Sequence, residues 1–388
     1  MAKKVDLPEP IIPNDSWKVV KLGQYVKILN GYPFDSSRFT NSNENTYPLI
    51  RIRDVVRGYT ETFTDEDCPD EYKIKKGEIL IGMDGDFNIS RWKSDFGLLN
   101  QRVCKISTVS KDLDEKFLFY YLPIPLKLIN DATPSVTVKH LSSTSLQELH
   151  FPLPTLAEQQ RIVNRIESMF AKLDEAKGKA QNVVDGFETR KAAILHKAFT
   201  GELTAKWRKE NGVSDDSWEE KRFDEFCLLK RGFDLPATQR IEGMYPLVSS
   251  SGIIDTHNEA KVKAPGIVTG RSGSIGKVFY IEEDFFPLNT TLYSQNLFGN
   301  NARYVYYYLS NFDFKSFSSS TAVPTLNRNN FSKVELKVPT LPEQVEIIRI
   351  LDIIIEKENK AKQAAEAVLE QIDLLKKSIL ARAFRGEL

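Results

Sequence analysis

The 388-residue sequence has little of several residue types that mark common protein classes. Its three cysteines, Cys68, Cys104 and Cys227, are odd in number and far apart, so we expect neither a disulfide framework nor a zinc knuckle. The four histidines are scattered, without a pair at the spacing of metal ligands. The sequence therefore predicts reduced cysteines and no bound metal.

Long apolar runs and an excess of one charge are also missing. No stretch approaches the roughly 18 apolar residues that a membrane span needs. No apolar run follows the lysines near Met1, as it would in a secretory signal. We therefore expect a cytoplasmic protein without a membrane partner. Hydrophobic residues make up 41% of the chain and charged residues 27%, which predicts folded cores, and the length suggests two or three domains.

What the sequence does contain is an internal repeat. The first copy holds PTLAEQQ at 154–160 and AFTGEL at 198–203, and the second holds PTLPEQV at 339–345 and AFRGEL at 383–388. Both offsets are 185, and residues 154–203 match residues 339–388 identically at 19 of 50 positions. A repeat of this length indicates two units built on one plan.

A looser similarity extends through the segment that precedes each copy. Trp17 and Gly31 correspond to Trp218 and Gly232, and each glycine is followed by an aromatic residue, Tyr32 or Phe233. We interpret these aromatic residues as shared core rather than as base-stacking groups. The offset falls from 201 to 187 along the segments, which indicates insertions in the first copy, where surface loops tolerate them.

Both copies of the repeat carry the apolar spacing of a coiled-coil helix. In the first copy, steps of four and three connect Ile162, Ile166, Met169, Leu173, Ala176, Ala180, Val183 and Phe187. This pattern predicts a helix from about 157 to 199, with bending or fraying at Gly178 or Gly186. The second copy has Glu358 at the position of Leu173, so we expect one polar or frayed layer there.

The remaining segments predict α+β domains in which β structure dominates. Short β-branched and aromatic runs such as YPLIRIRDV, GEILIGM and RVCKISTV alternate with Gly, Pro, Asn and Asp clusters, whereas FLFYYL and YVYYYL are expected to open short helices. The predicted order is a first domain at 1–153, a helix at 154–203, a charged linker at 204–217, a second domain at 218–338 and a helix at 339–388.

Connectivity orients the two helices. The first leaves the first domain and reaches the second domain, so the second helix must run back if the two seams pair lengthwise. We expect an antiparallel two-helix coiled coil with pseudo-two-fold symmetry, about 60 Å long, which separates the two domains. Domains held in this way could lie over DNA half-sites about 34 Å or more apart.

The paired signatures PLPTLAEQQRIV with AFTGEL and KVPTLPEQVEII with AFRGEL, each after a divergent domain, resemble the specificity subunit of type I restriction-modification systems. The resemblance covers nearly the whole chain. It implies two target recognition domains that each read one half of a bipartite, asymmetric sequence in double-stranded DNA. The motifs GMDGDFNISRWKSDFGLLNQRV and GRSGSIGKV also look like known subtypes of these domains.

The resemblance further implies that the helices dock methyltransferase and restriction subunits, which carry the chemistry. S-adenosylmethionine, ATP and Mg are therefore expected in partner subunits and not in this chain. Changing the length of the helices or of the 204–217 linker is expected to change the spacer between the half-sites and leave the half-sites themselves intact.

No motif of an enzyme is evident in the sequence. GRSGSIGK at 270–277 is not a phosphate-binding loop, because Arg271 stands where that motif needs glycine and Val278 where it needs Ser or Thr. We interpret it as a glycine-rich turn between strands, a reading compatible with a loop that faces DNA. Methyltransferase signatures are also missing, so a catalytic role for this chain is not expected.

Neither domain is basic. Residues 1–153 contain 20 Lys and Arg against 21 Asp and Glu, and residues 211–338 contain 14 against 15. DNA binding would have to come from local patches, and we expect the isolated chain to bind weakly. A coiled-coil protein-interaction scaffold without sequence-specific DNA binding remains the alternative.

Candidate DNA-reading residues are the cationic and amide side chains that the pattern places in loops, since arginine pairs with guanine and Asn or Gln with adenine. For each of them a solvated or turn residue is the alternative reading. They are Arg51, Arg53, Asp86, Asn88, Arg91, Lys93, Gln101, Arg102, Arg231, Arg271, Ser272, Lys277, Asn289, Asn327, Arg328 and Asn329.

Candidate partner-binding residues lie in the first turn of each predicted helix and in the GEL signatures. Helix capping and helix-to-domain packing are the alternative readings. The candidates are Glu158, Gln159, Phe199, Gly201, Glu202, Leu203, Glu343, Gln344, Phe384, Gly386, Glu387 and Leu388.

Overall fold

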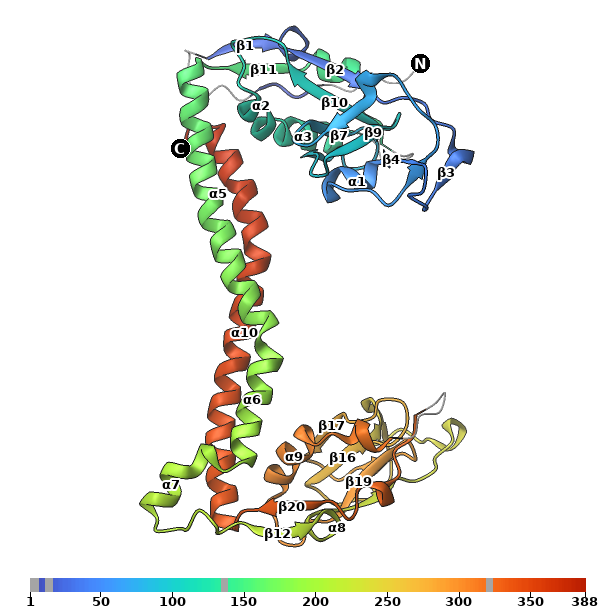
Figure 1. Cartoon of the computed structure of the whole chain (residues 1–388), viewed down its shortest axis with the longest axis vertical. Coiled ribbons are helices and arrows are strands. Elements are labelled where there is room, and N and C mark those ends of the chain that lie inside the picture. Colours follow the sequence, from blue (N-terminus) through green and yellow to red (C-terminus); the bar gives the residue numbers. More distant parts are fainter. Residues whose placement is uncertain (1–6, 11–16, 134–138, 319–323) are drawn as a thin grey trace. The chain divides into compact units, whose positions relative to one another are not determined.

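The computed structural model describes residues 7–10, 17–133, 139–318 and 324–388, which include every predicted site residue. Two compact units form the chain. The first consists of Met1–Lys179 with Val368–Leu388, and the second of Ala180–Ala367. Each unit combines one globular domain with segments of the long helices (Figure 1).

The globular domain of the first unit is a β-rich α+β structure. Its strands are β1 (Lys18–Lys21), β2 (Val26–Asn30), β3 (Phe39–Thr40), β4 (Tyr47–Ile50), β5 (Phe63–Thr64), β6 (Lys73–Lys75), β7 (Ile79–Gly82), β8 (Ile89–Arg91), β9 (Phe96–Leu99), β10 (Val103–Thr108) and β11 (His150–Leu153). Its helices are α1 (Ile52–Arg57), α2 (Glu115–Tyr121), α3 (Pro123–Ala132) and α4 (Ser143–Gln147). The strands form sheets in the orders β2-β10-β7-β8, β3-β5-β4-β9-β6 and β1-β11.

The second unit repeats this plan. Its strands are β12 (Glu219–Arg222), β13 (Leu228–Arg231), β14 (Tyr245–Ser249), β15 (Gly252–His257), β16 (Gly266–Gly270), β17 (Val278–Ile281), β18 (Phe286–Pro287), β19 (Thr291–Asn296) and β20 (Glu335–Val338), and its short helices are α7 (Ala205–Glu210), α8 (Phe223–Phe226) and α9 (Ala302–Asn311). The sheet β13-β19-β16-β17 has the order of β2-β10-β7-β8, and β12-β20 corresponds to β1-β11. The shared scaffold predicted from the repeat is therefore present.

The paired glycines mark a close backbone crossing in both domains. A Cβ atom on Gly31 would lie 2.0 Å from the carbonyl oxygen of Asn100, and one on Gly232 would lie 2.2 Å from that of Leu288. The aromatic residue after each glycine forms a parallel β-bridge, Tyr32 with Asn100 and Phe233 with Leu288. Only glycine fits these two positions, because any side chain would overlap the neighbouring backbone.

The paired aromatic residues belong to the cores. Trp17 is buried in the main core of the first unit, and Trp218 packs against the main core of the second. Tyr32 packs with Phe34 and Leu49, and Phe233 packs with Phe285 and Phe286. The reading of these residues as shared core agrees with the structure.

The repeated segments form the long helices α5 (Leu156–Asp185), α6 (Phe187–Phe199) and α10 (Leu341–Ala383). The helix expected at 157–199 is interrupted at Gly186, one of the two glycines at which bending was predicted. There the Arg190 side chain folds back, and its guanidinium donates to the Val183 carbonyl at 2.9 Å. A Cβ on Gly186 would meet the Arg190 Nη1 at 2.5 Å, so glycine makes room for this contact.

Glu358 forms the polar layer that the sequence predicts in the second helix. Its carboxylate accepts a hydrogen bond from the Arg190 Nε at 2.7 Å. Helix α10 runs unbroken through this position, so the layer is polar but not frayed.

Within each unit the helical segments pair in an antiparallel sense. In the first unit Arg161 of α5 donates to the Leu388 carbonyl at 3.0 Å, and Asp174 pairs with Lys376 of α10 at 2.5 Å. In the second unit the Lys362 ammonium lies 4.7 Å from the Phe187 ring centroid, four residues beyond the Arg190–Glu358 pair. Rising numbers on one helix thus meet falling numbers on the other. The separation of the two recognition domains by this pair stays a prediction.

Two local expectations need correction. YPLIRIRDV is a strand only through Ile50, because α1 follows at once. The carboxylate of Asp54 accepts from the Arg51 backbone N–H at 2.9 Å, and Gly58 ends the helix at φ +78°. The segment expected to be a plain linker contains α7, and its residue Arg208 is buried.

FLFYYL and YVYYYL do lie in helices, α2 and α9. The glycine-rich segment 270–277 connects the antiparallel strands β16 and β17, so its interpretation as a turn is confirmed. In the second unit α9 also contacts α6, which attaches the domain to its helix (Figure 1).

The three cysteines are free and buried, and none of the helices in the described ranges is long and apolar enough to cross a membrane.

Candidate nucleic-acid interface

A first cleft opens in the globular domain of the first unit, where β4 leads into α1 and β9 turns into β10. It has a volume of about 480 Å³. Four of the predicted DNA-reading residues, Arg51, Arg53, Gln101 and Arg102, line it. They come from the start of α1 and from the turn between β9 and β10, about fifty residues apart in the sequence. The remaining lining residues are Phe34, Ser36, Phe39, Ile52 and Asn100.

The side chains of Arg51 and Arg53 in the first cleft make few polar contacts within the protein. Arg53 donates to the Thr62 hydroxyl at 3.0 Å, and the Arg51 guanidinium lies 6.0 Å from the ring centroid of Phe39. Within the described part of the chain, neither the Arg51 guanidinium nor the Gln101 side-chain amide has a hydrogen-bond partner. The cleft therefore presents donors and an amide that a ligand can engage.

Arg102, at the same cleft, pairs with a carboxylate. Its Nη1 donates to Asp84 Oδ2 at 3.0 Å, and the other oxygen of Asp84 lies 2.6 Å from His140 Nδ1. Both Arg102 and His140 are exposed, so we expect solvent to weaken these interactions.

A second cleft lies in the globular domain of the second unit, at the end of β13. It has a volume of about 610 Å³. Arg231, Arg271, Asn327 and Arg328, all predicted DNA-reading residues, line it. The other lining residues are Lys230, Gly232, Phe233, Asp234, Leu292, Thr325 and Leu326. Like the first cleft, it adjoins the backbone crossing, which Gly232 and Phe233 form here.

In the second cleft the Asp234 carboxylate binds neighbouring donor side chains. Its carboxylate accepts two hydrogen bonds from Arg231, at 2.8 and 2.9 Å, and a further one from Asn289. The hydrogen bonds from Arg231 and Asn289, with weaker attraction by the Arg271 charge, hold the pKa of Asp234 below its usual value of 3.8. The carboxylate thus stays charged at neutral pH.

Within the described ranges, Arg271 presents an unpaired cationic side chain at the second cleft. Its backbone is fixed, because the N–H donates to the Thr290 carbonyl and the carbonyl accepts from Leu326, both at 2.8 Å. Its guanidinium has no hydrogen-bond or ion-pair partner among residues 7–10, 17–133, 139–318 and 324–388. A rigid backbone with an unpaired guanidinium suits the bidentate recognition of a base or phosphate.

Arg328 and Asn327 have structural contacts as well. Arg328 donates to the Leu229 carbonyl at 3.0 Å, and the Asn327 side chain accepts from the Asn329 backbone N–H at 3.1 Å. Both side chains nevertheless remain exposed at the cleft.

The other predicted residues of the first domain lie away from the first cleft. Asp86 and Asn88 are exposed in a separate hollow beside α3. Arg91 is committed within the fold, because it donates to the Gly77 carbonyl and the Glu115 carboxylate and stacks over Phe119. These contacts favour a structural role for Arg91, and its role in reading DNA stays a prediction. Lys93 is exposed, and its ammonium donates to the Val56 carbonyl of α1 at 3.4 Å.

Four further predicted residues of the second domain do not line the second cleft, and one of them, Asn289, donates to Asp234 at its edge. Ser272 forms a β-bridge with Thr325 through its backbone, Lys277 is exposed at the end of the glycine-rich turn, and Asn329 is exposed in a short 3-10 helix. Lys230 and the aromatic residues Phe34 and Phe39 line the clefts and were not predicted from the sequence. The adjacent basic pair Lys230 and Arg231, just before Gly232, was the available signal for the lysine.

Gln159 and Gln344 connect the long helices to the domains. Both are buried. The Gln159 side chain accepts from the Asp114 backbone at 2.8 Å and donates to the carbonyls of Asp112 and Pro154, both at 2.9 Å. Gln344 makes the corresponding set with Asn301, Asn300 and Pro339 (2.9, 2.8 and 2.9 Å). The expectation of partner contact is corrected at both positions, because their amides are fully used inside the chain.

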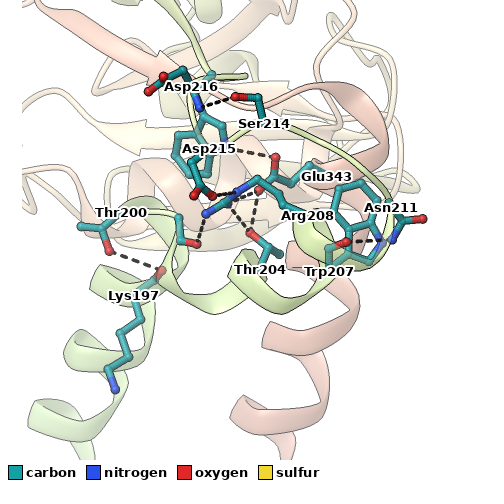
Figure 2. Close-up of polar contacts among 12 residues, drawn as sticks. Lys197, Thr200, Thr204, Trp207, Arg208, Asn211, Ser214, Asp215, Asp216 and Glu343 are labelled. Carbon is teal, nitrogen blue, oxygen red and sulfur yellow. Dashed lines mark hydrogen bonds and ion pairs between the residues drawn. The ribbon is translucent and has the colours of Figure 1, made fainter.

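Glu343 is also buried, at the centre of a polar network (Figure 2). Its Oε1 accepts from Arg208 Nη1 and from the Thr204 hydroxyl, each at 2.6 Å, and its Oε2 accepts from the Trp218 indole at 3.1 Å. Its role is therefore structural rather than partner contact. Glu158, its counterpart in the first copy, is only half-buried and pairs with Arg161 on its own helix.

The GEL signatures divide into packed and exposed residues. Phe384 is buried against Phe117 and Tyr121, with ring centroids 5.2 Å apart in both pairs, and Phe199 packs on Tyr304 and Tyr308. Gly201 is buried and has φ +81°, and Leu203 and Leu388 pack against the cores. Among the predicted partner-binding residues of these signatures, Glu202, Gly386 and Glu387 are exposed. Helix-to-domain packing, the alternative reading, accounts for the packed residues.

The fold thus defines a class of proteins in which two globular domains share one scaffold. Each domain has a polar cleft and is joined to one copy of the repeated helix. The family model described as type I restriction modification DNA specificity domain matches residues 14–184 and 215–371. The chain therefore belongs to the type I restriction-modification DNA specificity family. Its function is that of a specificity subunit, a recognition component and not an enzyme, and the scaffold alternative is not favoured.

Individual relatives agree with this membership. The type I restriction enzyme EcoBI specificity subunit of Escherichia coli is 30% identical over 97% of this chain and 87% of its own length. The EcoKI specificity subunit of Escherichia coli strain K12 is 21% identical over 96% and 89%. Among solved structures, the HsdS subunit from Thermoanaerobacter tengcongensis has a similar fold, with a TM-score of 0.63, 17% identity and coverage of 97% and 98%.

Proposed function

We propose that the chain selects a bipartite, asymmetric target in double-stranded DNA, with the first cleft reading one half-site and the second cleft the other. The observation that carries this proposal is that eight predicted DNA-reading side chains gather as two sets of four, one set in each cleft. The two clefts have different side chains on the same scaffold, as two different half-sites require.

The chemistry of each cleft suits a groove of DNA. Arginine fits the two acceptors of guanine, and the side-chain amide of Gln101 or Asn327 fits adenine. The carboxylate of Asp234 limits the positive charge of the second cleft, and the domains are neutral overall. Binding by the isolated chain is therefore expected to be weak, with phosphate contacts shared by partner subunits.

The proposed partners are methyltransferase and restriction subunits, and the half-buried Glu158 and the exposed residues Glu202, Gly386 and Glu387 remain candidates for contact with them. S-adenosylmethionine, ATP and Mg would be used by those subunits. The target is DNA, and the corresponding compartment is the cytoplasm.

Competition binding tests the proposal. A labelled duplex carrying the target is challenged with unlabelled specific or random duplexes, with and without a methyltransferase subunit. The expected result is a preference for the specific duplex that strengthens when the methyltransferase subunit is present. Equal competition by all duplexes in the presence of that subunit would contradict the proposal.

A further inference from the structure

The most completely buried ionic contact in the second unit is not in a cleft but at the junction of α6, the linker and α10. Glu343 is 0% exposed, and the side chain of its partner Arg208 is 8% exposed. A buried ion pair forms only when its remaining donors and acceptors are satisfied, so it needs one arrangement of its surroundings. The Arg208–Glu343 pair therefore favours one arrangement of the segments that meet at this junction.

Arg208 donates hydrogen bonds to residues of several segments that meet there (Figure 2). Besides Glu343 at the start of α10, its guanidinium donates to the Gly201 carbonyl after α6 at 2.9 Å and to the Thr204 hydroxyl at 3.2 Å. It also donates to Asp215 at 3.0 Å, close to where the second domain begins. Gly201 is needed for this approach, because its φ is +81° and a Cβ there would crowd the guanidinium at 3.2 Å.

Trp218 completes the junction from the domain side. Its indole N–H donates to the oxygen of Glu343 that Arg208 does not use, at 3.1 Å. Residues 208 and 218 are thus bound to the same carboxylate, although nine residues separate them. The chain between them is a closed loop with both ends fixed.

The hydrogen bonds of that intervening segment are short in range: Asn211 donates to the Trp207 carbonyl at 2.8 Å, and the Asp216 N–H donates to the Ser214 hydroxyl at 3.3 Å. Residues 209–216 are exposed except for Val213, which is half-buried and whose N–H returns to the Arg208 carbonyl at 2.9 Å. A Cβ on Gly212 would meet nothing within 4 Å. Additional residues at this tip can extend into solvent without moving either end.

We infer that Arg208 and Glu343 form a lock that fixes the second recognition domain to the helices α6 and α10, so that half-site spacing is independent of the length of segment 209–214. The inference rests on the proposed function. It revises the expectation that the whole 204–217 linker sets the spacer, because Arg208 binds Glu343 of α10 before segment 209–214 begins. Arg208 is a positioning residue and touches no DNA.

The test inserts Gly-Ser-Gly between Asn211 and Gly212 in the full chain, assembled with its methyltransferase subunit in cells, and reads the methylated motif by genome-wide sequencing. We expect the same two half-sites and the same spacer as for the parent chain. A spacer that changes with the insertion would overturn the lock. A parent motif that is not bipartite would instead contradict the proposed function, so the two failures are distinguishable.

A second experiment breaks the Arg208–Glu343 ion pair. The insertion is combined with Glu343→Gln or with Arg208→Lys, and we expect additional spacer lengths with unchanged half-sites. The matched control combines it with Glu210→Gln, an exposed acid of α7 that pairs with Lys206 on its own helix, which we expect to leave the motif unchanged. A single unchanged spacer in both lock variants would contradict the inference, because a merely structural pair would lower activity without altering spacing.

If the complexes that contain the lock variants do not methylate DNA, hydrogen exchange tests the lock instead. In Glu343→Gln without the insertion, we expect faster exchange confined to residues 201–218 and the first turns of α10. Exchange equal to that of the parent in this region would overturn the lock.

Discussion

Gln344, buried at the start of α10, accepts a hydrogen bond from the backbone of Asn301, the N-cap residue of α9, at 2.9 Å. In the first unit Gln159 does the same to Asp114, the N-cap of α2, at 2.8 Å. One amide in each copy of the repeat thus joins a long helix to the aromatic helix of its domain. This contact explains why the glutamine occurs in both copies.

Gln344→Ala is expected to destabilise the second unit by about 1 to 3 kcal/mol, because it leaves buried polar groups without partners. Chemical denaturation measures the loss, and hydrogen exchange assigns it to α9 and the start of α10. Gln160→Ala is the control, since Gln160 is exposed and bonds only along its own helix, to Asn164. Equal effects of the two substitutions would contradict the structural role of Gln344.

Asp234→Asn is expected to strengthen binding to all duplexes and to reduce the preference for the specific one. The substitution removes a negative charge from the second cleft and releases Arg231 from its ion pair. Binding should then fall more steeply with salt, because one more cation contacts phosphate. Salt titration of specific and random duplexes checks this, with Asp255→Asn, an exposed acid of strand β15, as control. An unchanged salt dependence in Asp234→Asn would argue against the second cleft as a DNA site.

The cysteines provide a prediction that depends on pH. Burial raises the pKa of the Cys104 and Cys227 thiols to about 12, so they remain protonated in the folded chain while unfolded thiols ionise near pH 9. Their contribution to stability is complete below pH 9 and declines as the pH rises toward 12. We expect neither thiol to react with Ellman's reagent at pH 8 until denaturant is added. Rapid reaction of both in the native chain would contradict their burial.

The elements of the internal repeat were predicted best from the sequence. Heptad spacing predicted the long helices, the interruption at Gly186 and the polar layer at Glu358, because each depends on residues close together along one element. The strand after Tyr47 was extended too far, since α1 depends on Asp54 capping its own first turn and on Gly58 ending it. That competition between helix and strand is decided by local hydrogen bonds that an apolar pattern does not reveal.

Site residues were harder to predict because their roles depend on distant partners. Arg91 and Arg271 are both loop-proximal arginines in the sequence, but Glu115 and Phe119 engage the first, whereas the second has no such partner in the described ranges. Arg208 lay in a segment whose composition suggests a linker. Its buried partner, Glu343, is 135 residues away, so no local pattern connects the two.

The most direct test of two independent clefts is the methylated motif of single-residue variants, each assembled with its methyltransferase subunit. Gln101→Ala should relax one base of one half-site, and Arg271→Ala one base of the other, each by about 1 to 3 kcal/mol or roughly 5- to 150-fold in discrimination. Lys93→Ala and Lys277→Ala, exposed residues outside the clefts, should leave the motif unchanged. Relaxation of the same half-site by Gln101→Ala and Arg271→Ala, or of neither, would contradict the account.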